Sequence, residues 1–224
     1  MDGKFSEYRQ KNYTFFEQAF KELPDGIRIV DLGAGPQQFK ALTVRFQVIA
    51  VDHEQFPGIN VVADLNTDLP LPSNTFDAIM LSNVLEHIFN PQKLIDESFR
   101  ILKPGGKFIA SVPFLSKVHQ APHDYLRYTY FELFRLTSQF EKIAIEPLGT
   151  PYDVFNVTTR HFLKRLYRSN RHRGIIRRIA LKLHTLLYYF LLTFFRKLYD
   201  SAIPNLDFTY GYGIIAYKPH DDKK

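Results

Sequence analysis

The chain has 224 residues, of which 45% are hydrophobic and 23% are charged, as expected for one globular core with an appendage. It contains no cysteine, which excludes a disulfide framework, a thiolate zinc site and a thiol nucleophile. This composition is compatible with a reducing, intracellular setting, and we expect a cytoplasmic protein.

The first 20 residues mix charged and apolar side chains, so they lack the apolar stretch of a secretory signal. We expect the first helix of the fold there.

The positive charge is concentrated in one segment. The formal net charge is +6, yet residues 160–197 alone contain eleven Arg and Lys residues and no Asp or Glu. The rest of the chain is therefore acidic on balance. Such a block favours contact with an anionic surface or substrate, with a solvated helix face as the alternative.

Short apolar runs alternate with helical patterns along the first half of the chain. We expect helices at 37–43 and 91–102, and buried strands at the following positions: 27–32, 48–51, 59–63, 76–81 and 108–112. Strands that alternate with helices predict parallel pairing through right-handed crossovers. Ligands are then expected at the C-terminal ends of the strands.

The last third of the chain breaks this alternation. Two further strands are expected at 143–145 and 213–217. Between them, residues 150–205 are interpreted as a basic helical insertion before the last strand.

A DxGxG turn, formed by Asp31, Gly33 and Gly35, follows the first strand directly. Glycines let a ligand approach the backbone, and the acid can accept a hydrogen bond from an ammonium or hydroxyl group. One alternative is a nicotinamide dinucleotide fingerprint, GxGxxG, but the position of its third glycine holds Gln38. A purely structural tight turn is the other alternative.

The ends of the next strands sharpen this interpretation. Asp52 lies about 20 residues after the first glycine, where an acid holds ribose hydroxyls in this architecture. Asp64 and Leu65 follow the third strand and offer a carboxylate and an apolar side chain where an adenine ring would lie.

Several segments together resemble the type 11 (UbiE-like) class I S-adenosylmethionine-dependent methyltransferases: DLGAG at 31–35, VDHE at 51–54, ADL at 63–65, FDAIMLSNVLEHI at 76–88 and ILKPGGKFIASVP at 101–113. The match covers about residues 25–115. It implies one methyltransferase domain over 1–224, an α/β Rossmann-like three-layer sandwich. The implied sheet has seven strands and is mostly parallel with an antiparallel last strand, plus the helical insertion before that strand.

The resemblance also implies S-adenosylmethionine as the cofactor. Its expected contacts are Asp31, Gly33 and Gly35 at the methionine part, Asp52 with the adjacent His53 at the ribose, Asp64 and Leu65 at the adenine, and Ser82 or Asn83 near the sulfonium. The family often has a further glycine where this chain has Gln37, so Gln37 is a candidate contact rather than a spacer.

The segment at 112–129, VPFLSKVHQAPHDYLRYT, is the expected catalytic loop. It resembles the HxxPHDYxRYT segment of type 11 methyltransferases of polysaccharide and cell-envelope biosynthesis, which implies a hydroxyl acceptor. His123 with Asp124 is the first candidate for general base and His119 the second. An Asp124–Arg127 pair that only holds the loop is the alternative. Candidate substrate contacts are Tyr125, Arg127 and Tyr128.

A metal site is a weighed alternative in the same region. Some methyltransferases of this fold bind a divalent metal through an ExxEH motif and later histidines, and here Glu86 and His87 could act with His119 or His123. The first acid of that motif is Asn83 in this chain, which weakens a site for a hard cation. We therefore expect no metal.

Residues 174–199 predict an amphipathic helix, with Arg177, Arg178 and Lys182 outside an apolar stripe of Ile176, Ile179, Leu183, Leu186, Leu187, Phe190, Phe194 and Leu198. Its apolar core of about ten residues is too short to cross a bilayer, which takes about twenty. Burial against the sheet, or against a partner subunit in a homodimer, would explain the stripe. The sharper hypothesis is an anionic membrane surface, at the inner membrane face, where the enzyme meets lipid-linked glycan acceptors. Nucleic acid as the anionic partner is less favoured than membrane binding or core packing, because the sequence contains no nucleic-acid recognition module.

Two hypotheses of function follow. The first is an O-methyltransferase that acts on a saccharide or a related hydroxyl acceptor, with a small-molecule acceptor or N-methylation left open. The second is a non-catalytic binding or assembly protein that keeps the fold. The acids at 31, 52 and 64 favour the first.

Overall fold

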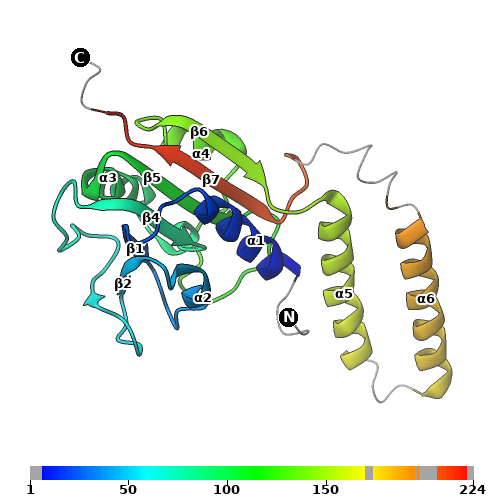
Figure 1. The fold of residues 1–224 in the computed structure, drawn as a ribbon. Coiled ribbons are helices and arrows are strands. Elements are labelled where there is room, and N and C mark those ends of the chain that lie inside the picture. Colours follow the sequence, from blue (N-terminus) through cyan, green and yellow to red (C-terminus); the bar gives the residue numbers. More distant parts are fainter. Residues whose placement is uncertain (1–6, 170–173, 195, 197–205, 221–224) are drawn as a thin grey trace. The chain divides into compact units, whose positions relative to one another are not determined.

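The computed structural model describes residues 7–169, 174–194, 196 and 206–220. The chain divides into two compact units, one formed by Met1–Leu148 with Gly211–Lys224 and the other by Gly149–Tyr210. The first unit contains the sheet and the second contains two long helices (Figure 1). Residues 1–6 of the first predicted helix, and residues 170–173 and 197–205 of the predicted insertion, lie outside the described residues.

The sheet has the strand order β3-β2-β1-β4-β5-β7-β6. The strands are β1 (Arg28–Leu32), β2 (Gln47–Asp52), β3 (Val61–Val62), β4 (Phe76–Ser82), β5 (Leu102–Pro113), β6 (Glu141–Pro147) and β7 (Gly211–Tyr217). The first five pair in parallel, whereas β7 runs antiparallel to both β5 and β6. The predicted seven-stranded sheet with an antiparallel last strand is confirmed.

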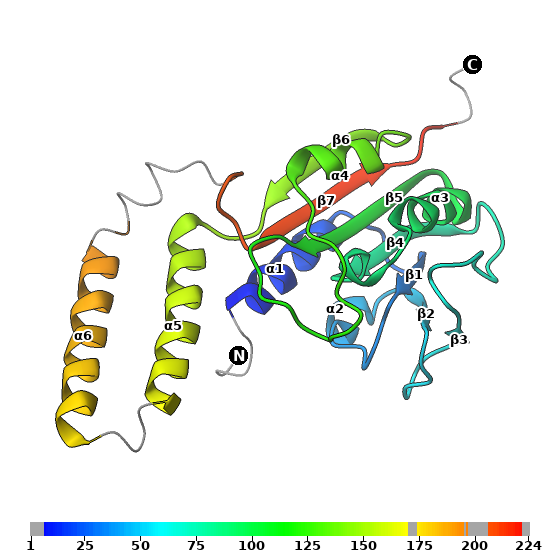
Figure 2. The ribbon, with the colours of Figure 1, turned by 180° about the vertical axis from the view of Figure 1, so that it is seen from behind.

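Helices cover both faces of this sheet (Figures 1 and 2). The strand β1 illustrates the reason, because its side chains alternate between two buried clusters. Ile29 packs in one cluster with Phe16 of α1 (Glu7–Lys21). Val30 packs in the other with Leu94 of α3 (Pro91–Ile101). All four side chains are fully buried, and each such burial contributes about 1.5–3 kcal/mol, so the three layers are held by apolar contacts on both faces.

Two helices of the first unit differ from the expectation. The helix α2 is limited to Lys40–Thr43, because the chain before it turns through Gln37, which has a left-handed φ of 54°. The helix α4 (Tyr130–Leu136) was not expected. It begins at Thr129, whose side chain accepts a hydrogen bond from the Glu132 amide. The sequence Thr-x-x-Glu is a capping-box pattern and would have predicted it.

The second unit consists of α5 (Pro151–Ser169) and α6 (Ile175–Phe194). A hydrogen bond of 2.7 Å between the Thr159 and Tyr188 hydroxyls joins the two helices. Along α6, large apolar side chains are exposed by 43% to 72%: Ile175, Ile179, Leu183, Leu186, Leu187, Phe190, Leu191 and Phe194. The predicted stripe residue Leu198 and the side chains of Ile176 and Arg177 lie outside what is described. Within the described residues, we find no helix with the length and apolarity needed to cross a membrane.

Candidate functional site

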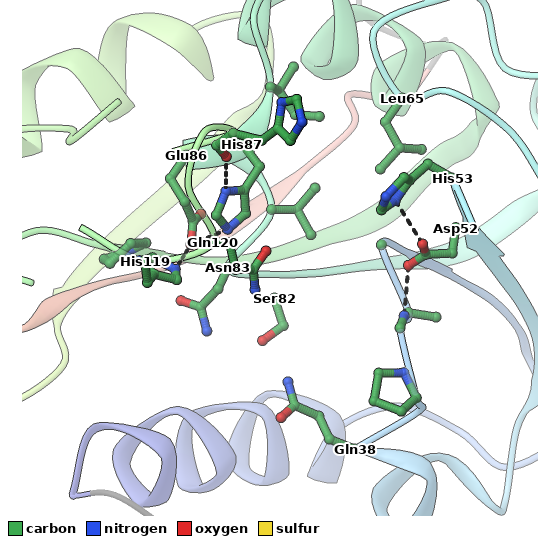
Figure 3. Close-up of a pocket in the computed structure, with 18 of the residues that line it drawn as sticks. Gln38, Asp52, His53, Leu65, Ser82, Asn83, Glu86, His87, His119 and Gln120 are labelled. Atoms are coloured by element: carbon green, nitrogen blue, oxygen red, sulfur yellow. Dashed lines mark hydrogen bonds and ion pairs between the residues drawn. The ribbon is translucent and has the colours of Figure 1, made fainter. Parts of the chain in front are cut away.

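A cavity of about 1140 Å³ lies at the C-terminal ends of the parallel strands, and all its lining residues belong to the first unit. Its walls come from the turns after β1, β2 and β4, from α1 and from the loop after β5. Figure 3 shows Asp52 and His53 on one side, Glu86, His87 and His119 on the other, and Ser82 and Asn83 between them. This edge of an open parallel sheet is where ligands bind.

The two glycines of the turn after β1 have different reasons to be glycine. Both have left-handed φ angles, 76° at Gly33 and 50° at Gly35. A Cβ atom at Gly33 would lie 2.5 Å from Cγ2 of Val84, so this position allows the turn to pack against the chain that follows β4. A Cβ at Gly35 would meet nothing within 4 Å. Gly35 therefore presents its backbone to the open cavity.

Asp52, at the end of β2, is a buried carboxylate with donors already in place. Its side chain is 7% exposed. Oδ2 accepts a hydrogen bond from the Gly35 amide at 2.8 Å, and Oδ1 accepts one from the Glu54 amide at 3.1 Å. Nδ1 of the exposed His53 lies 2.9 Å from Oδ1. Oδ2, with one donor, keeps a lone pair for a ligand, because each carboxylate oxygen can accept about two hydrogen bonds.

Asp31, at the end of β1, does not line the cavity but lies close enough to Asp52 to interact with its charge. Burial, and then the negative charge of Asp52, raise the pKa of Asp31 to about 7. Two neighbouring carboxylates of this kind favour a cationic ligand, which would stabilise both ionised forms.

Asp64 and Leu65, which follow β3, both line the cavity. The Asn66 amide and side chain each donate to Asp64 Oδ1 at 2.9 Å, and these hydrogen bonds lower the pKa of Asp64. Leu65 is buried and Phe56 lines the same wall. This side of the cavity thus combines an ionised carboxylate with apolar surface.

The middle of the cavity is built from β4 and α1. Asn12 donates to the Ser82 hydroxyl at 2.9 Å, and the Tyr8 hydroxyl donates to Asn83 Oδ1 at 2.5 Å. The predictions from the sequence missed the part played by α1. Asn12 is only 1% exposed, and an Asn on the apolar face of the first helix was the available signal, since a buried polar side chain needs a partner.

The structure separates the two neighbouring glutamines of the first turn. The Gln37 side chain donates to the Gly58 carbonyl at 2.6 Å and does not line the cavity, whereas Gln38 does. A role for Gln37 in cofactor contact stays a prediction, and its observed contact is with the loop after β2.

Glu86, His87 and His119 form what we call the histidine cluster. Glu86 lies in the short helix η1 (Leu85–His87) and is 0% exposed. Its Oε1 is 3.6 Å from His87 Nε2 and 3.7 Å from His119 Nε2. These separations exceed a hydrogen bond, and neither carboxylate oxygen accepts one from any described residue. Burial raises the pKa of Glu86 to about 8, while burial also lowers the pKa of His87.

The loop after β5 is held against η1 through its other predicted site residues. Asp124 accepts two hydrogen bonds from Arg127, at 2.6 and 2.8 Å, and one from the His119 amide at 2.8 Å. The Arg127 bonds in particular hold the pKa of Asp124 well below its usual range. The Tyr128 hydroxyl donates to the Leu85 carbonyl at 2.8 Å, and its side chain is buried outside the cavity wall.

The expected pairing of His123 with Asp124 is not the one that the structure has. Asp124 lies beside His119, with Oδ2 3.3 Å from Nδ1. His123 lines the cavity by itself, and its Nδ1 is 2.8 Å from the Tyr125 hydroxyl. The reason is that the two strong bonds to Arg127 turn the Asp124 carboxylate toward the start of the loop.

Known proteins resemble the first unit. Residues 30–110 match the type 11 family model, described as a methyltransferase domain. An uncharacterised protein of Methanocaldococcus jannaschii is 32% identical over 109 residues, which are 45% of this chain and 53% of that protein. The demethylmenaquinone methyltransferase of Renibacterium salmoninarum is 30% identical over 97 residues, 38% of this chain and 41% of that enzyme. The chain spans about half or less of the length of these relatives.

Among solved structures, the phosphoethanolamine N-methyltransferase 2 of Haemonchus contortus, in complex with phosphomonomethylethanolamine and S-adenosylhomocysteine, has a TM-score of 0.57. It is 17% identical and the match covers 94% of this chain and 53% of that one, so the likeness concerns the fold. The sheet order and the cavity at its edge define a class I methyltransferase fold. Residues 30–110 thus match a methyltransferase domain of the type 11 family, and the predicted resemblance to that family is confirmed over this part of the chain.

Proposed function

We propose that the protein is an S-adenosylmethionine-dependent methyltransferase that acts on a hydroxyl acceptor. The observation that carries the proposal is that one cavity joins the glycine turn and Asp52 to the loop of histidines after β5. A cofactor bound at the first end would direct its methyl group toward an acceptor at the second.

The residues at the first end fit this cofactor. Gly35 leaves open space beside its backbone, and Oδ2 of Asp52 keeps a lone pair for a ribose hydroxyl. Leu65 offers apolar surface for a purine, and the raised pKa of Asp31 suits a nearby ammonium group. The bound cofactor supplies an electrophilic methyl group, so the protein has mainly to align the acceptor and take its proton.

His123 is the proposed general base. Its ring lines the cavity, and its Nδ1 is 2.8 Å from the Tyr125 hydroxyl. In the proposed tautomer Nδ1–H donates to that oxygen, so Nε2 has the lone pair that takes the proton. In the transfer, the acceptor oxygen forms a bond to the methyl carbon as the carbon–sulfur bond breaks, and the hydroxyl proton passes to Nε2. A base is required for an alcohol because its oxygen is a weak nucleophile while protonated.

The acceptor is proposed to be a saccharide, carried on a lipid. Around His123 the wall combines polar groups with the exposed rings of Tyr125 and Phe89, which meet edge to face at 6.1 Å. Such a surface suits a ligand with both polar and apolar faces. The resemblance of the 112–129 loop to enzymes of cell-envelope biosynthesis points the same way.

The second unit is proposed to bind an anionic membrane surface. Leu183, Leu186 and Phe190 follow helical spacing along α6 and are 62%, 70% and 64% exposed. An exposed apolar stripe in a segment rich in Arg and Lys is the pattern of a helix that lies in the headgroup region. Lipid-linked acceptors would be reached from there.

Vesicle sedimentation tests the membrane proposal. We expect the full chain to bind vesicles that contain anionic phosphatidylglycerol, and Leu186→Asp with Phe190→Asp to abolish binding. The matched control is Phe131→Asp, which changes a side chain of the first unit that is 79% exposed. The proposal would be contradicted if neither the native chain nor the double variant binds vesicles and only the double variant is a monomer. The apolar stripe would then be a dimer interface.

Calorimetry with S-adenosylmethionine tests the enzyme proposal. Micromolar binding is expected, weakened by about 1 to 3 kcal/mol in Asp52→Ala because a charge-assisted polar contact is lost. The control is Asp68→Ala, at an exposed acid outside the cavity. Transfer of a labelled methyl group to a lipid extract, abolished in His123→Ala, would then separate an enzyme from a non-catalytic protein. No binding of the cofactor would contradict both steps.

A further inference from the structure

The histidine cluster contains buried polar atoms that accept no hydrogen bond from the described residues around them. Both oxygens of Glu86 and the Nε2 of His87 are buried and have no hydrogen-bond partner among the described residues. The ligand atoms of Glu86, His87 and His119 lie within 4.8 Å of one another, and Figure 3 shows the three side chains converging. A buried polar atom without a partner is rare in folded proteins and indicates an ion or ligand that completes it.

The hydrogen bonds around His87 present Nε2 as a lone-pair donor. Its Nδ1 is 2.5 Å from the His123 carbonyl. Because a carbonyl can only accept, Nδ1 carries the proton, and Nε2 of a neutral ring is left without one. A histidine that donates its other ring N–H to a backbone carbonyl is the usual arrangement of a metal ligand.

His119 has a backbone carbonyl and a carboxylate beside its Nδ1, with the Lys117 carbonyl at 3.4 Å. Asp124 Oδ2 lies 3.3 Å from His119 Nδ1, and His119 Nε2 faces Glu86 at 3.7 Å. Asp124 is itself fixed by two hydrogen bonds from Arg127, so the guanidinium contacts Asp124 directly and acts on Glu86 only through its charge. A carboxylate beside one ring nitrogen of a histidine whose other ring nitrogen faces further ligand atoms is the arrangement found around bound zinc.

We propose that Glu86, His87 and His119 bind a divalent first-row transition ion, with Glu86 Oε1 and the two Nε2 atoms as ligands. Two imidazoles and one carboxylate suit zinc or a similar ion better than magnesium or calcium, which prefer oxygen ligands. Ligands about 2.0–2.2 Å from a tetrahedral ion are about 3.4 Å apart. The two distances from Glu86 Oε1, 3.6 and 3.7 Å, are already close to this value, and the ligand atoms as a set lie within 4.8 Å of one another.

Three protein ligands leave at least one position of the ion open. All three residues line the cavity, so the open position faces it. If the proposed function holds, that position would take the acceptor oxygen and make its proton easier to remove by His123. The site itself does not depend on methyl transfer.

Zinc calorimetry on the full chain, after removal of metal with a chelator, tests the proposal. We expect one zinc ion per chain with a Kd in the micromolar range or below. Glu86→Gln and His119→Ala should each weaken zinc binding by at least about 100-fold, and Asp124→Asn by about 10- to 100-fold, since it orients a ligand without being one. Cobalt should give a ligand-field spectrum in the native chain that is lost in Glu86→Gln.

The control is His161→Ala, which removes an exposed histidine of α5 and should leave zinc affinity unchanged. Binding weaker than about millimolar in the native chain, or equal affinity in Glu86→Gln, would overturn the proposal. His119 is partly exposed, so His119→Ala should fold even if Glu86→Gln does not. Separate titration with S-adenosylmethionine distinguishes failure of the metal site from failure of the proposed enzyme.

Discussion

The cavity contains two buried carboxylates in opposite electrostatic situations. Asp52 receives a backbone hydrogen bond on each oxygen, from Gly35 and Glu54. Glu86 is fully buried and receives none from the described residues. The fold therefore supplies hydrogen-bond donors to Asp52 and leaves Glu86 in need of a proton or a cation.

This difference shows which end of the cavity is costly for the fold. Leaving a buried charged group without a partner costs about 1–3 kcal/mol or more. The rest of the structure holds Glu86 in place despite that cost, through the bonds of Tyr125 and Leu126 to its backbone carbonyl. A group retained at such a cost is a candidate for function.

Glu86→Gln should make the metal-free protein more stable at alkaline pH, and this is the largest effect we expect. The pKa of Glu86 is about 8 in the fold against an ordinary 4.5, so the folded state holds a proton that the unfolded state has released. Stability therefore falls as pH rises from about 4.5 to 8, by roughly 2 to 5 kcal/mol for this group. Urea unfolding with a chelator present, at pH 5 and pH 9, measures it.

Between pH 5 and pH 9, the free energy of unfolding should fall further in the native chain than in Glu86→Gln, by the amount given above. Asp52→Asn is the matched control, because Asp52 has its donors and its removal should lower stability at both pH values. Equal pH dependence in the native chain and in Glu86→Gln would mean that the two carboxylates do not differ as the contacts indicate.

Substitution of the two glycines at the Asp52 end should lower the free energy of unfolding by clearly different amounts. Gly33→Ala would place a Cβ 2.5 Å from Val84 at a φ of 76°, and strain plus overpacking should lower the free energy of unfolding by about 2–4 kcal/mol. Gly35→Ala meets no atom within 4 Å and should cost only about 1 kcal/mol of backbone strain. Chemical denaturation measures both, and equal losses would contradict the packing role of Gly33.

The sequence predicted the sheet edge on which Asp52 lies, whereas it offered the meeting of Glu86 and His87 with a later histidine only as an alternative. Asp31 and Asp52 lie at the ends of β1 and β2, and Asp64 lies just after β3, so parallel pairing alone brings them to one edge of the sheet. Their positions depend only on local patterns and on the topology, both of which are readable along the chain.

The histidine cluster depends on a long-range return of the chain. Glu86 and His119 are far apart in sequence and meet because the loop after β5 folds back on η1 through hydrogen bonds to the Glu86 carbonyl. No period or spacing predicts such a return, and the sequence suggested Glu86 and His87 together with His119 or His123 only through the likeness to an ExxEH motif. For the same reason, the sequence paired Asp124 with its neighbour His123, whereas the Arg127 fork turns Asp124 to His119.

Asp31 predicts a pH dependence of cofactor binding at the first end. Its pKa of about 7 means that it is largely protonated at pH 6 and ionised at pH 8, and only the ionised form attracts a cation. Affinity for S-adenosylmethionine should rise up to about tenfold between these values. Asp31→Asn should bind more weakly and without this rise, whereas Asp64→Asn should keep it, because Asp64 has a low pKa. Calorimetry at three pH values measures this dependence. If the affinity of Asp31→Asn still rises with pH, Asp31 is not the group responsible.

The smallest effect concerns Tyr8, which lies between the two ends. Its hydroxyl donates to Asn83, and burial, followed by the negative charge of Glu86, raises the pKa of Tyr8. Tyr8→Phe should lower stability by about 1 kcal/mol through the lost hydrogen bond and weaken cofactor binding a few-fold, while zinc affinity stays within about twofold. Tyr13→Phe keeps the stacking on Phe39 and should change neither. A joint loss of cofactor and zinc binding in Tyr8→Phe would mean that α1 couples the two ends, since residues in one contact network do not contribute independently.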